Sequence, residues 1–379
     1  MITAEMIDRV IRFHGEGVPV VSAYVAVPAK PHDRRTVRSR LKSLAHGIRP
    51  LTEDQTLDRR AKLSLRRDVE RLKGLAGEDR LKPGTLAVFT CSGRDLFDEF
   101  ALPRAVHDGI MVDATPWVRP LLAVLDEYHR YCVAVIDKGS AHVWELYMGE
   151  MREVANVRDR TLRKPNYAAG LDEDHVRNKA DELEKRHFRK VAALLDALFR
   201  TDGHELLIIG GHQHEFSEFV NFLPRELQQR VAGTFTLDPA TATRADIRQN
   251  ADAIVESYER EEERQAVAEI VQTVAAGGRA ALGLEPCLLA GSVAAVNALV
   301  VQEGALAPGV VCDRDGWLAV SGEACPLCGN ATRHTADVID ELVQAVITDG
   351  GSIEHVLADT ELKEHLAGAS LRFPLPQTS

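Results

Sequence analysis

Several features that would assign a protein at once are missing from this sequence. The N-terminal stretch MITAEMIDRVIRFHGEG mixes charges among its apolar positions, so no secretory signal is expected. The longest apolar run, Pro286–Val301, contains Ser292 and Asn297 and is too short to span a membrane. Six cysteines scattered over 379 residues do not make a disulfide scaffold. These absences predict a cytoplasmic protein with no membrane contact.

Motifs that mark common enzyme classes are also absent. The sequence has no G-x-S-x-G, no P-loop and no G-x-G-x-x-G. Cys91, Cys132 and Cys287 lie in or beside apolar stretches, which favours packed thiols over nucleophiles. The pattern therefore favours a protein that is not an enzyme.

What the sequence does contain is a basic region in an acidic chain. The net charge is −11, yet between Lys30 and Lys73 fourteen Lys and Arg stand against six Asp and Glu. Such asymmetry suggests a directed contact with a polyanion, and two solvated amphipathic helices are the alternative. Typical apolar and charged fractions indicate a soluble globular protein, and the length predicts two or three domains.

The order of strand-like and helix-like segments predicts a multidomain α/β protein. Residues 1–127 read as a basic α+β domain, with PVVSAYVAV and GTLAVFT as buried strands around two Arg-rich helices. Residues 128–262 open with strands, then a polar loop RDRTLRKPNYAAGLDEDH, then a long helix. Residues 263–379 again alternate helix and strand, with an insertion at 310–334.

A histidine pair is the sharpest enzyme-like string. His212 and His214 in GGHQHEF follow a buried strand, a common place to hold a catalytic metal, and Glu215 is the local candidate for a third ligand. A polar strand-to-helix turn with incidental histidines is the simpler interpretation, because two ligands alone are weak evidence. The Gly-Gly before His212 caps a core strand and does not indicate a mobile hydrolysis loop.

The insertion contains two similar knuckles, CDRDG and CPLCG. Cys312 and Asp315 occupy the places that Cys325 and Cys328 occupy in the second knuckle, and a glycine follows each pair. Two such knuckles form a zinc ribbon, so these four residues are the candidate ligands of one structural zinc. Asp is a less usual ligand in closed sites, and His334 is a substitute candidate. A decayed ribbon stabilised by packing is the alternative.

The stretch HVRNKADELEKRHFRKVAALLDALF, preceded by YCVAVIDKGSAHVWEL, resembles the central domain of the archaeal and eukaryotic class I release factor and Pelota superfamily. LLIIGGHQHEFSEFVNFLPRELQQRVAGTFTLD is similar to the strand–helix–strand that follows there. ELVQAVITDGGSIEHV and the ending LAGASLRFPL are similar to the last domain. The resemblance is closest to the bacterial members.

That resemblance implies a three-domain protein shaped for the ribosomal A site. It implies a central RNase H-like domain and a C-terminal α/β/α domain of the kind shared with kink-turn-binding ribosomal proteins, carrying a zinc-ribbon-like insertion. The partner implied is ribosomal RNA, with a translational GTPase as a further candidate partner. The protein is expected to be a monomer when off the ribosome.

The sequence lacks two motifs that release factors use for peptide release and for stop-codon recognition, although the order of its segments resembles theirs. The loop that carries Gly-Gly-Gln in release factors contains no glutamine here, and DQTLDRRAKLSLRR lacks the Asn-Ile-Lys-Ser motif. What remains is a set of side chains suited to phosphates and bases. The predicted RNA-binding residues are Arg59, Arg60, Lys62, Arg66, Arg67, Arg158, Arg160, Arg163, Lys164 and Tyr167.

The sequence thus predicts a ribosome-binding factor without Gly-Gly-Gln that fills the A site in ribosome rescue or in hibernation during stress. One alternative is a divergent peptidyl-tRNA hydrolase or a metal-dependent hydrolase using His212 and His214. Another is an RNA-binding stress protein that works off the ribosome.

Overall fold

The computed structural model describes residues 4–53, 57–75, 81–103, 106–126, 130–147, 150–158, 173–201 and 203–375. The chain forms two compact units, residues 1–126 with 263–379, and residues 127–262. Several sheets and helices confirm the predicted multidomain α/β class. The division into three domains at 127 and 262 stays a prediction. Within the described ranges, no helix combines the length and apolar character that a membrane crossing needs.

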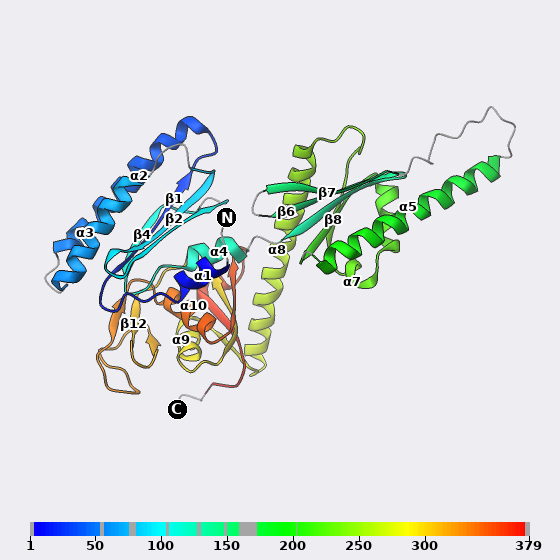
Figure 1. Cartoon of the computed structure of the whole chain (residues 1–379). Helices are drawn as coiled ribbons and strands as arrows, with labels where there is room; N and C mark the ends of the chain where they lie inside the picture. The colour runs from blue at the N-terminus through cyan, green and yellow to red at the C-terminus, as the bar shows by residue number, and fades with distance from the viewer. Residues whose placement is uncertain are drawn as a thin grey trace. The chain divides into compact units, whose positions relative to one another are not determined.

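In the first unit, the N-terminal segment forms a four-stranded antiparallel sheet in the order β3-β2-β1-β4 (Figure 1). Its strands are β1 (Val20–Val27), β2 (Gly84–Cys91), β3 (Leu96–Leu102) and β4 (Gly109–Asp113). The helices of this segment are α1 (Ala4–Ile11), α2 (Arg35–Gly47), α3 (Arg59–Gly74) and α4 (Arg119–Asp126). The two predicted strands are thus the central strands, and the Arg-rich stretches are α2 and α3.

Both faces of this sheet are apolar, which explains why β1 and β2 are continuous hydrophobic runs. On one face, Val21 and Val25 pack with Leu41 of α2 and Leu65 of α3. On the other face, Tyr24 makes an edge-to-face contact with Phe89, with ring centroids 5.8 Å apart. Helices α2 and α3 therefore bury one side against β1 and β2 and leave the other side to solvent.

The C-terminal segment of the first unit is built on a second sheet in the order β10-β16-β11-β15. Its strands are β10 (Ala280–Leu282), β11 (Val296–Gln302), β15 (Ser352–Val356) and β16 (Ala367–Leu371), and its helices are α9 (Leu284–Ser292), α10 (Val338–Thr348) and α11 (Leu362–His365). Val343 of α10 packs in the core on one face, and Val267 of α8 (Arg244–Ala275) packs with Val300 on the other. Helix α10 ends just before Gly350-Gly351, and SIEHV forms strand β15, in line with the predicted alternation of helix and strand.

The predicted insertion is a small sheet of its own. Its three short strands have the order β13-β12-β14 and pair antiparallel. They are β12 (Gly309–Val311), β13 (Leu318–Ala319) and β14 (Arg333–Thr335). The cysteine-bearing turns lie at the end of β12 and between β13 and β14.

The second unit is a five-stranded mixed sheet in the order β7-β6-β5-β8-β9. β5, β8 and β9 run parallel, whereas β6 is antiparallel to both of its neighbours. The strands are β5 (Tyr131–Asp137), β6 (Ser140–Tyr147), β7 (Glu150–Arg158), β8 (Leu206–Gly211) and β9 (Val231–Thr236). Helices α5 (Glu173–Thr201), α6 (Gln213–Phe219) and α7 (Arg225–Gln228) share the core of one face, and residues 244–262 of α8 cover the other.

The glycine pair that ends β8 has a packing role. A Cβ on Gly210 would lie 2.4 Å from the Phe235 ring, and one on Gly211 would lie 2.2 Å from the Ile136 carbonyl oxygen. Gly211 also has φ +144°, a conformation that side chains rarely adopt. The pair therefore closes a core strand, as expected from the sequence.

Candidate functional site

The two cysteine-bearing turns of the insertion have the same backbone hydrogen bonds. The Gly316 amide donates to the Cys312 carbonyl over 2.9 Å, and the Gly329 amide donates to the Cys325 carbonyl over 2.9 Å. In each turn the cysteine amide donates over 2.8 Å to the carbonyl of the residue after the glycine. Both glycines have positive φ, +67° and +73°, so each turn closes in the left-handed region. The knuckles predicted from CDRDG and CPLCG are equivalent in structure.

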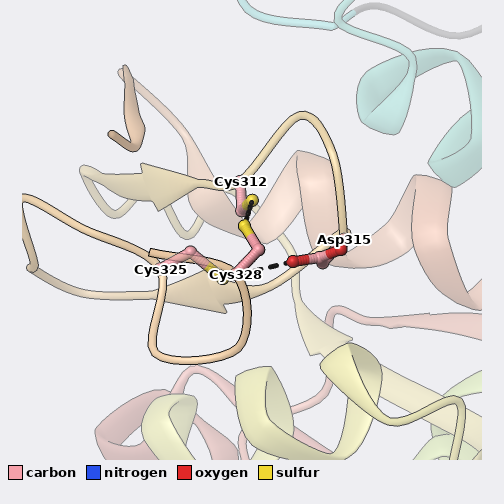
Figure 2. A group of neighbouring side chains, drawn as sticks. All are labelled: Cys312, Asp315, Cys325 and Cys328. Atoms are coloured by element: carbon pink, nitrogen blue, oxygen red, sulfur yellow. Dashed lines mark hydrogen bonds between the residues drawn. The ribbon is translucent and has the colours of Figure 1, made fainter. Parts of the chain in front are cut away.

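The knuckles bring the four predicted ligands together (Figure 2). One ligand atom from each of Cys312, Asp315, Cys325 and Cys328 lies within 4.8 Å of the other three. The Sγ atoms of Cys312 and Cys328 are 3.6 Å apart, and Cys325 Sγ is 3.7 Å from Asp315 Oδ2. Ligands at about 2.3 Å from a tetrahedral ion are about 3.8 Å from one another. The donor set and its spacing therefore fit a tetrahedral metal ion.

Neighbouring groups shift the pKa of two of these thiols in opposite directions. A hydrogen bond from the Asp315 backbone lowers the pKa of Cys312. A hydrogen bond to the Asp315 carboxylate raises the pKa of the Cys328 thiol to about 12, because only the protonated thiol can donate it. Three thiolates and one carboxylate repel one another at this spacing, and a bound cation removes that repulsion.

The insertion sheet supports the second knuckle, but it does not bring His334, the substitute candidate, into the group of ligands. An isolated bridge between Ala324 and Ala331 closes the chain around Cys325 and Cys328. His334 lies on β14, is exposed, and is not part of the ligand group. Asp315 thus occupies the fourth corner, and the alternative with His334 is not supported.

The histidine pair of the second unit has no comparable surroundings. His212 and His214 are exposed at the start of α6, and Asp238 lies beside His212, with Nε2 and Oδ1 4.0 Å apart. Glu215 is buried, and burial raises its pKa, which opposes service as an anionic ligand. Among the described residues, the cysteine cluster alone brings three or more metal-ligating side chains together.

The predicted RNA-binding residues of the first domain lie on one side of α3. Arg59, Arg60, Arg66 and Arg67 are exposed, and Lys62 is half-buried. The exposed cations of α2 add to the same helical pair; they are Arg35, Arg38 and Lys42. Glu70, the exposed acid of α3, is paired with Lys73 at 2.8 Å. The solvent side of α2 and α3 is therefore strongly cationic.

Two aspartates fix which side of α3 faces solvent. Asp58 caps the helix, accepting from the Ala61 amide at 2.7 Å. Asp68 is fully buried and accepts from the Thr90 hydroxyl at 2.7 Å and from the Ser92 amide at 2.9 Å. Asp68 ties the helix to the end of β2, so Arg59, Arg66 and Arg67 lie on the solvent side, whereas Arg60 Nη2 donates to the Gly93 carbonyl over 3.0 Å.

The remaining predicted RNA-binding residues lie at the end of β7 and beyond it in the sequence. Arg158 is the last residue of β7 and is exposed. Arg160, Arg163, Lys164 and Tyr167 lie outside the described residues. Their role stays a prediction.

A buried polar cluster that no sequence pattern indicated joins the two segments of the first unit. Arg119 Nη2 lies 2.8 Å from Asp337 Oδ2, and the Arg119 amide donates to Asp340 Oδ1 over 2.9 Å. Gln344 Nε2 donates to Asp340 Oδ2 and to the Pro116 carbonyl, both over 2.9 Å. Burial raises the pKa of Asp340 to about 8. No local pattern could reveal the contacts of Arg119 and Pro116 with α10, because those partners are more than 200 positions apart.

A protein-family model matches the middle of the chain. Residues 116–256 match the family model described as bacterial archaeo-eukaryotic release factor family 10. The matched range includes all five strands of the second unit. This match confirms the resemblance to the bacterial branch of the release factor and Pelota superfamily that the sequence motifs indicated.

Three solved structures are among those similar to this chain. Pelota from Archaeoglobus fulgidus is 18% identical over 77% of this chain and 80% of its own, with a TM-score of 0.37. A ribosome-bound archaeal Pelota, in a model with ABCE1, is 16% identical over 99% and 96%, with a TM-score of 0.44. Dom34 from S. cerevisiae is 12% identical over 77% and 81%, with a TM-score of 0.43. A comparison with curated proteins found no match.

Proposed function

We propose that this chain, whose central part is of the bacterial archaeo-eukaryotic release factor type, is a ribosome-binding translation factor related to ribosome rescue. It fills the A site of stalled or idle ribosomes and does not cleave peptidyl-tRNA. The observation that carries the proposal is the family match over residues 116–256. The sequence segment 158–175, which corresponds to the Gly-Gly-Gln segment of release factors, contains no glutamine, and this supports a role in occupancy without hydrolysis.

Ribosomal RNA is the proposed partner of α2 and α3. A surface with exposed arginines and one paired acid attracts the phosphate backbone, and arginine suits phosphates because its planar group donates two hydrogen bonds at once. Arg158 and the four predicted residues beyond it, the three cations Arg160, Arg163 and Lys164 and the aromatic Tyr167, are proposed to add a second contact. The binding energy from such contacts falls steeply with salt.

The finer assignment of the domains follows the same proposal. The central sheet has three parallel strands, β5, β8 and β9, with β6 antiparallel beside β5, and this order supports an RNase H-like domain. The C-terminal sheet with α9 and α10 on one face and α8 on the other supports the α/β/α domain. The insertion is proposed to be a zinc ribbon.

One structural zinc is the metal proposed for the four ligands. Three thiolates favour zinc over magnesium or calcium, which prefer oxygen ligands. The chain's own residues supply a closed set with no open position for a substrate, so the role is structural. Cys312 and Cys325 are almost fully buried, at 1% and 2% exposure, which suits a permanent site.

Co-sedimentation with 70S ribosomes tests the proposal. The full chain should bind, and binding should weaken steeply between about 50 and 200 mM salt. Arg66→Glu with Arg67→Glu should weaken binding about tenfold and lower the salt dependence. A control with the same charge change, Arg225→Glu with Lys363→Glu, should bind as the unaltered chain does. No binding to ribosomes at low salt would contradict the proposal.

The same samples separate the alternatives. Peptide release from peptidyl-tRNA by the purified chain would support the hydrolase alternative. Crosslinking to free RNA without ribosome binding would support the off-ribosome alternative. Ribosome profiles from growing and starved cells would distinguish rescue of stalled ribosomes from hibernation, and a co-purifying translational GTPase would identify a second partner.

A further inference from the structure

The guanidinium of Arg333 contacts three carboxylates from three parts of the first unit. Its Nη1 lies 2.5 Å from Asp113 Oδ1, its Nε 3.0 Å from Asp313 Oδ1, and its Nη2 2.7 Å from Glu341 Oε1. Asp113 ends β4 of the N-terminal sheet, Asp313 lies in the first knuckle, and Glu341 lies in the first turn of α10. Each of the three guanidinium nitrogens thus contacts a carboxylate from a different part of the first unit.

The contact with β4 is reinforced from the same short strand. The Thr335 hydroxyl donates to Asp113 Oδ2 over 2.9 Å, so both oxygens of this carboxylate are held by β14. The Asp113 and Arg333 side chains are 12% and 21% exposed. This clasp, formed by Asp113, Arg333 and Thr335, fastens the N-terminal sheet to the insertion.

The clasp and the metal ligands share one small sheet. Arg333 pairs with Val311 across β12 and β14, and Cys312 follows Val311 directly. Asp313, the next residue, accepts from Arg333 Nε. The metal ligand Cys312 and Asp313, a partner of Arg333, are therefore adjacent in the chain, and fixing one restricts the other.

We propose that Arg333 and Asp313 are positioning residues that couple metal binding in the insertion to docking of the N-terminal sheet. With a metal on Cys312 and Asp315, the turn between them is fixed and Asp313 holds Arg333 in line with Asp113. Without the metal, Asp313, which is 53% exposed, is free to turn to water, and Arg333 loses one of its three fixed partners. The inference rests on the metal site of the proposed function.

Coupling of this kind is reciprocal, which makes it testable away from the ligands. If the metal strengthens docking by some factor, loss of docking weakens metal binding by the same factor. Asp113→Asn in the full chain should therefore lower zinc affinity at least ~5-fold, measured by competition with a chromophoric chelator. Glu99→Gln is the matched control, because it removes one negative charge from the same sheet at an exposed position on β3. It should leave the affinity unchanged.

Hydrogen exchange measures the effect in the other direction, that of zinc binding on the docking of the N-terminal sheet. Removing zinc should speed amide exchange in β4, Gly109–Asp113, and leave β2 unchanged, and zinc should have no effect on β4 in the Asp113→Asn chain. Thr335→Val, a milder change that does not touch a knuckle residue, should lower zinc affinity in the same direction. It serves as the second variant should Asp113→Asn fold poorly.

The outcomes separate this inference from the proposals on which it rests. Equal zinc affinity in the unaltered chain, Asp113→Asn and Thr335→Val, with β4 exchange independent of zinc, would overturn the coupling and leave the metal site standing. A chain that binds no zinc would overturn both the metal site and the coupling. Ribosome binding, measured on the same samples, decides the translation-factor proposal separately.

Discussion

The side chain of Arg119 forms an ion pair with Asp337 in the interior of the first unit, with Nη2 and Oδ2 2.8 Å apart and side-chain exposures of 5% and 0%. The two residues belong to opposite ends of the chain, 218 positions apart. Asp337 also caps α10, accepting from the Ile339 amide at 3.2 Å. The pair therefore joins the start of α4 to the start of the core helix α10.

Removing one partner of this pair should be strongly destabilising. Asp337→Ala leaves the Arg119 charge buried without its partner, and we expect a loss of about 3–5 kcal/mol in the free energy of unfolding of the first unit. Arg119→Met together with Asp337→Leu should recover much of that loss, because no uncompensated charge remains. Denaturant unfolding of the full chain measures both.

A surface pair gives the control for that measurement. Lys363 and Asp359 are 2.7 Å apart but 54% and 88% exposed. Asp359→Ala should change the unfolding free energy by less than about 1 kcal/mol. Equal effects of Asp337→Ala and Asp359→Ala would contradict the assignment of the buried pair.

Stability should decrease as pH rises from about 4 to 8 because of Asp340. Burial raises its pKa to about 8 in the folded chain, whereas the unfolded carboxyl titrates near 3.9. Between these values the folded state holds a proton that the unfolded state has released, so each pH unit costs up to ~1.4 kcal/mol. Asp337 and Glu341, whose pKa values burial also raises, act in the same direction. Arg119 opposes the rise in pKa at Asp337, and Arg333 opposes it at Glu341.

Asp340→Asn tests that slope. Asparagine keeps an oxygen to accept from the Arg119 amide but cannot ionise, so the stability of the variant should depend less on pH between 5.5 and 7.5. Unfolding free energies at several pH values, for the unaltered chain and the variant, give the two slopes. Parallel slopes would show that Asp340 is ionised in the folded state.

Zinc stoichiometry should follow the cysteine cluster and not the histidine pair. The unaltered chain should bind one zinc, because the four donors fit one tetrahedral ion. Cys325→Ser should lose it, since a hydroxyl is a poor ligand for zinc beside thiolates. His212→Ala with His214→Ala should bind one zinc, as the unaltered chain does. Metal analysis of the purified proteins decides between the two sites.

Gly210→Ala should destabilise the second unit by about 1–3 kcal/mol. The added methyl group would lie 2.4 Å from the Phe235 ring, so the ring or the strand must move. Gly47→Ala, at the end of α2 with nothing within 4 Å, should be neutral or slightly stabilising. Thermal unfolding of the two variants compares them directly.

The features that could be predicted from the sequence are those with a local signal. β1 and β2 are continuous apolar runs, and the two knuckles each place their ligands three positions apart with a glycine after them, so the four ligands could be named. The edge strand β4 is half-exposed along its length and has no such run. It was therefore not predicted.

The contacts between the N-terminal and C-terminal segments of the first unit could not be predicted, for a different reason. Arg119, Asp337 and Asp340 look like ordinary surface charges in the sequence, because nothing nearby marks them as buried. Asp113 and Arg333 are likewise separated by 220 positions. Such contacts depend on tertiary packing alone, and a single sequence does not contain the pairing.

The separation of Arg119 from Asp337 in the sequence also affects the order in which the parts of the chain can fold during synthesis. Synthesis at about 5–20 residues per second means that Arg119 leaves the peptidyl transferase centre roughly 10–40 s before Asp337 is made. Until then the N-terminal sheet has neither its clasp nor its buried ion pair, while the intervening residues of the second unit can already fold. The first unit is therefore the last to be completed. In a nascent chain that stops before Asp337, Arg119 does not have the partner with which it forms a buried ion pair in the finished protein.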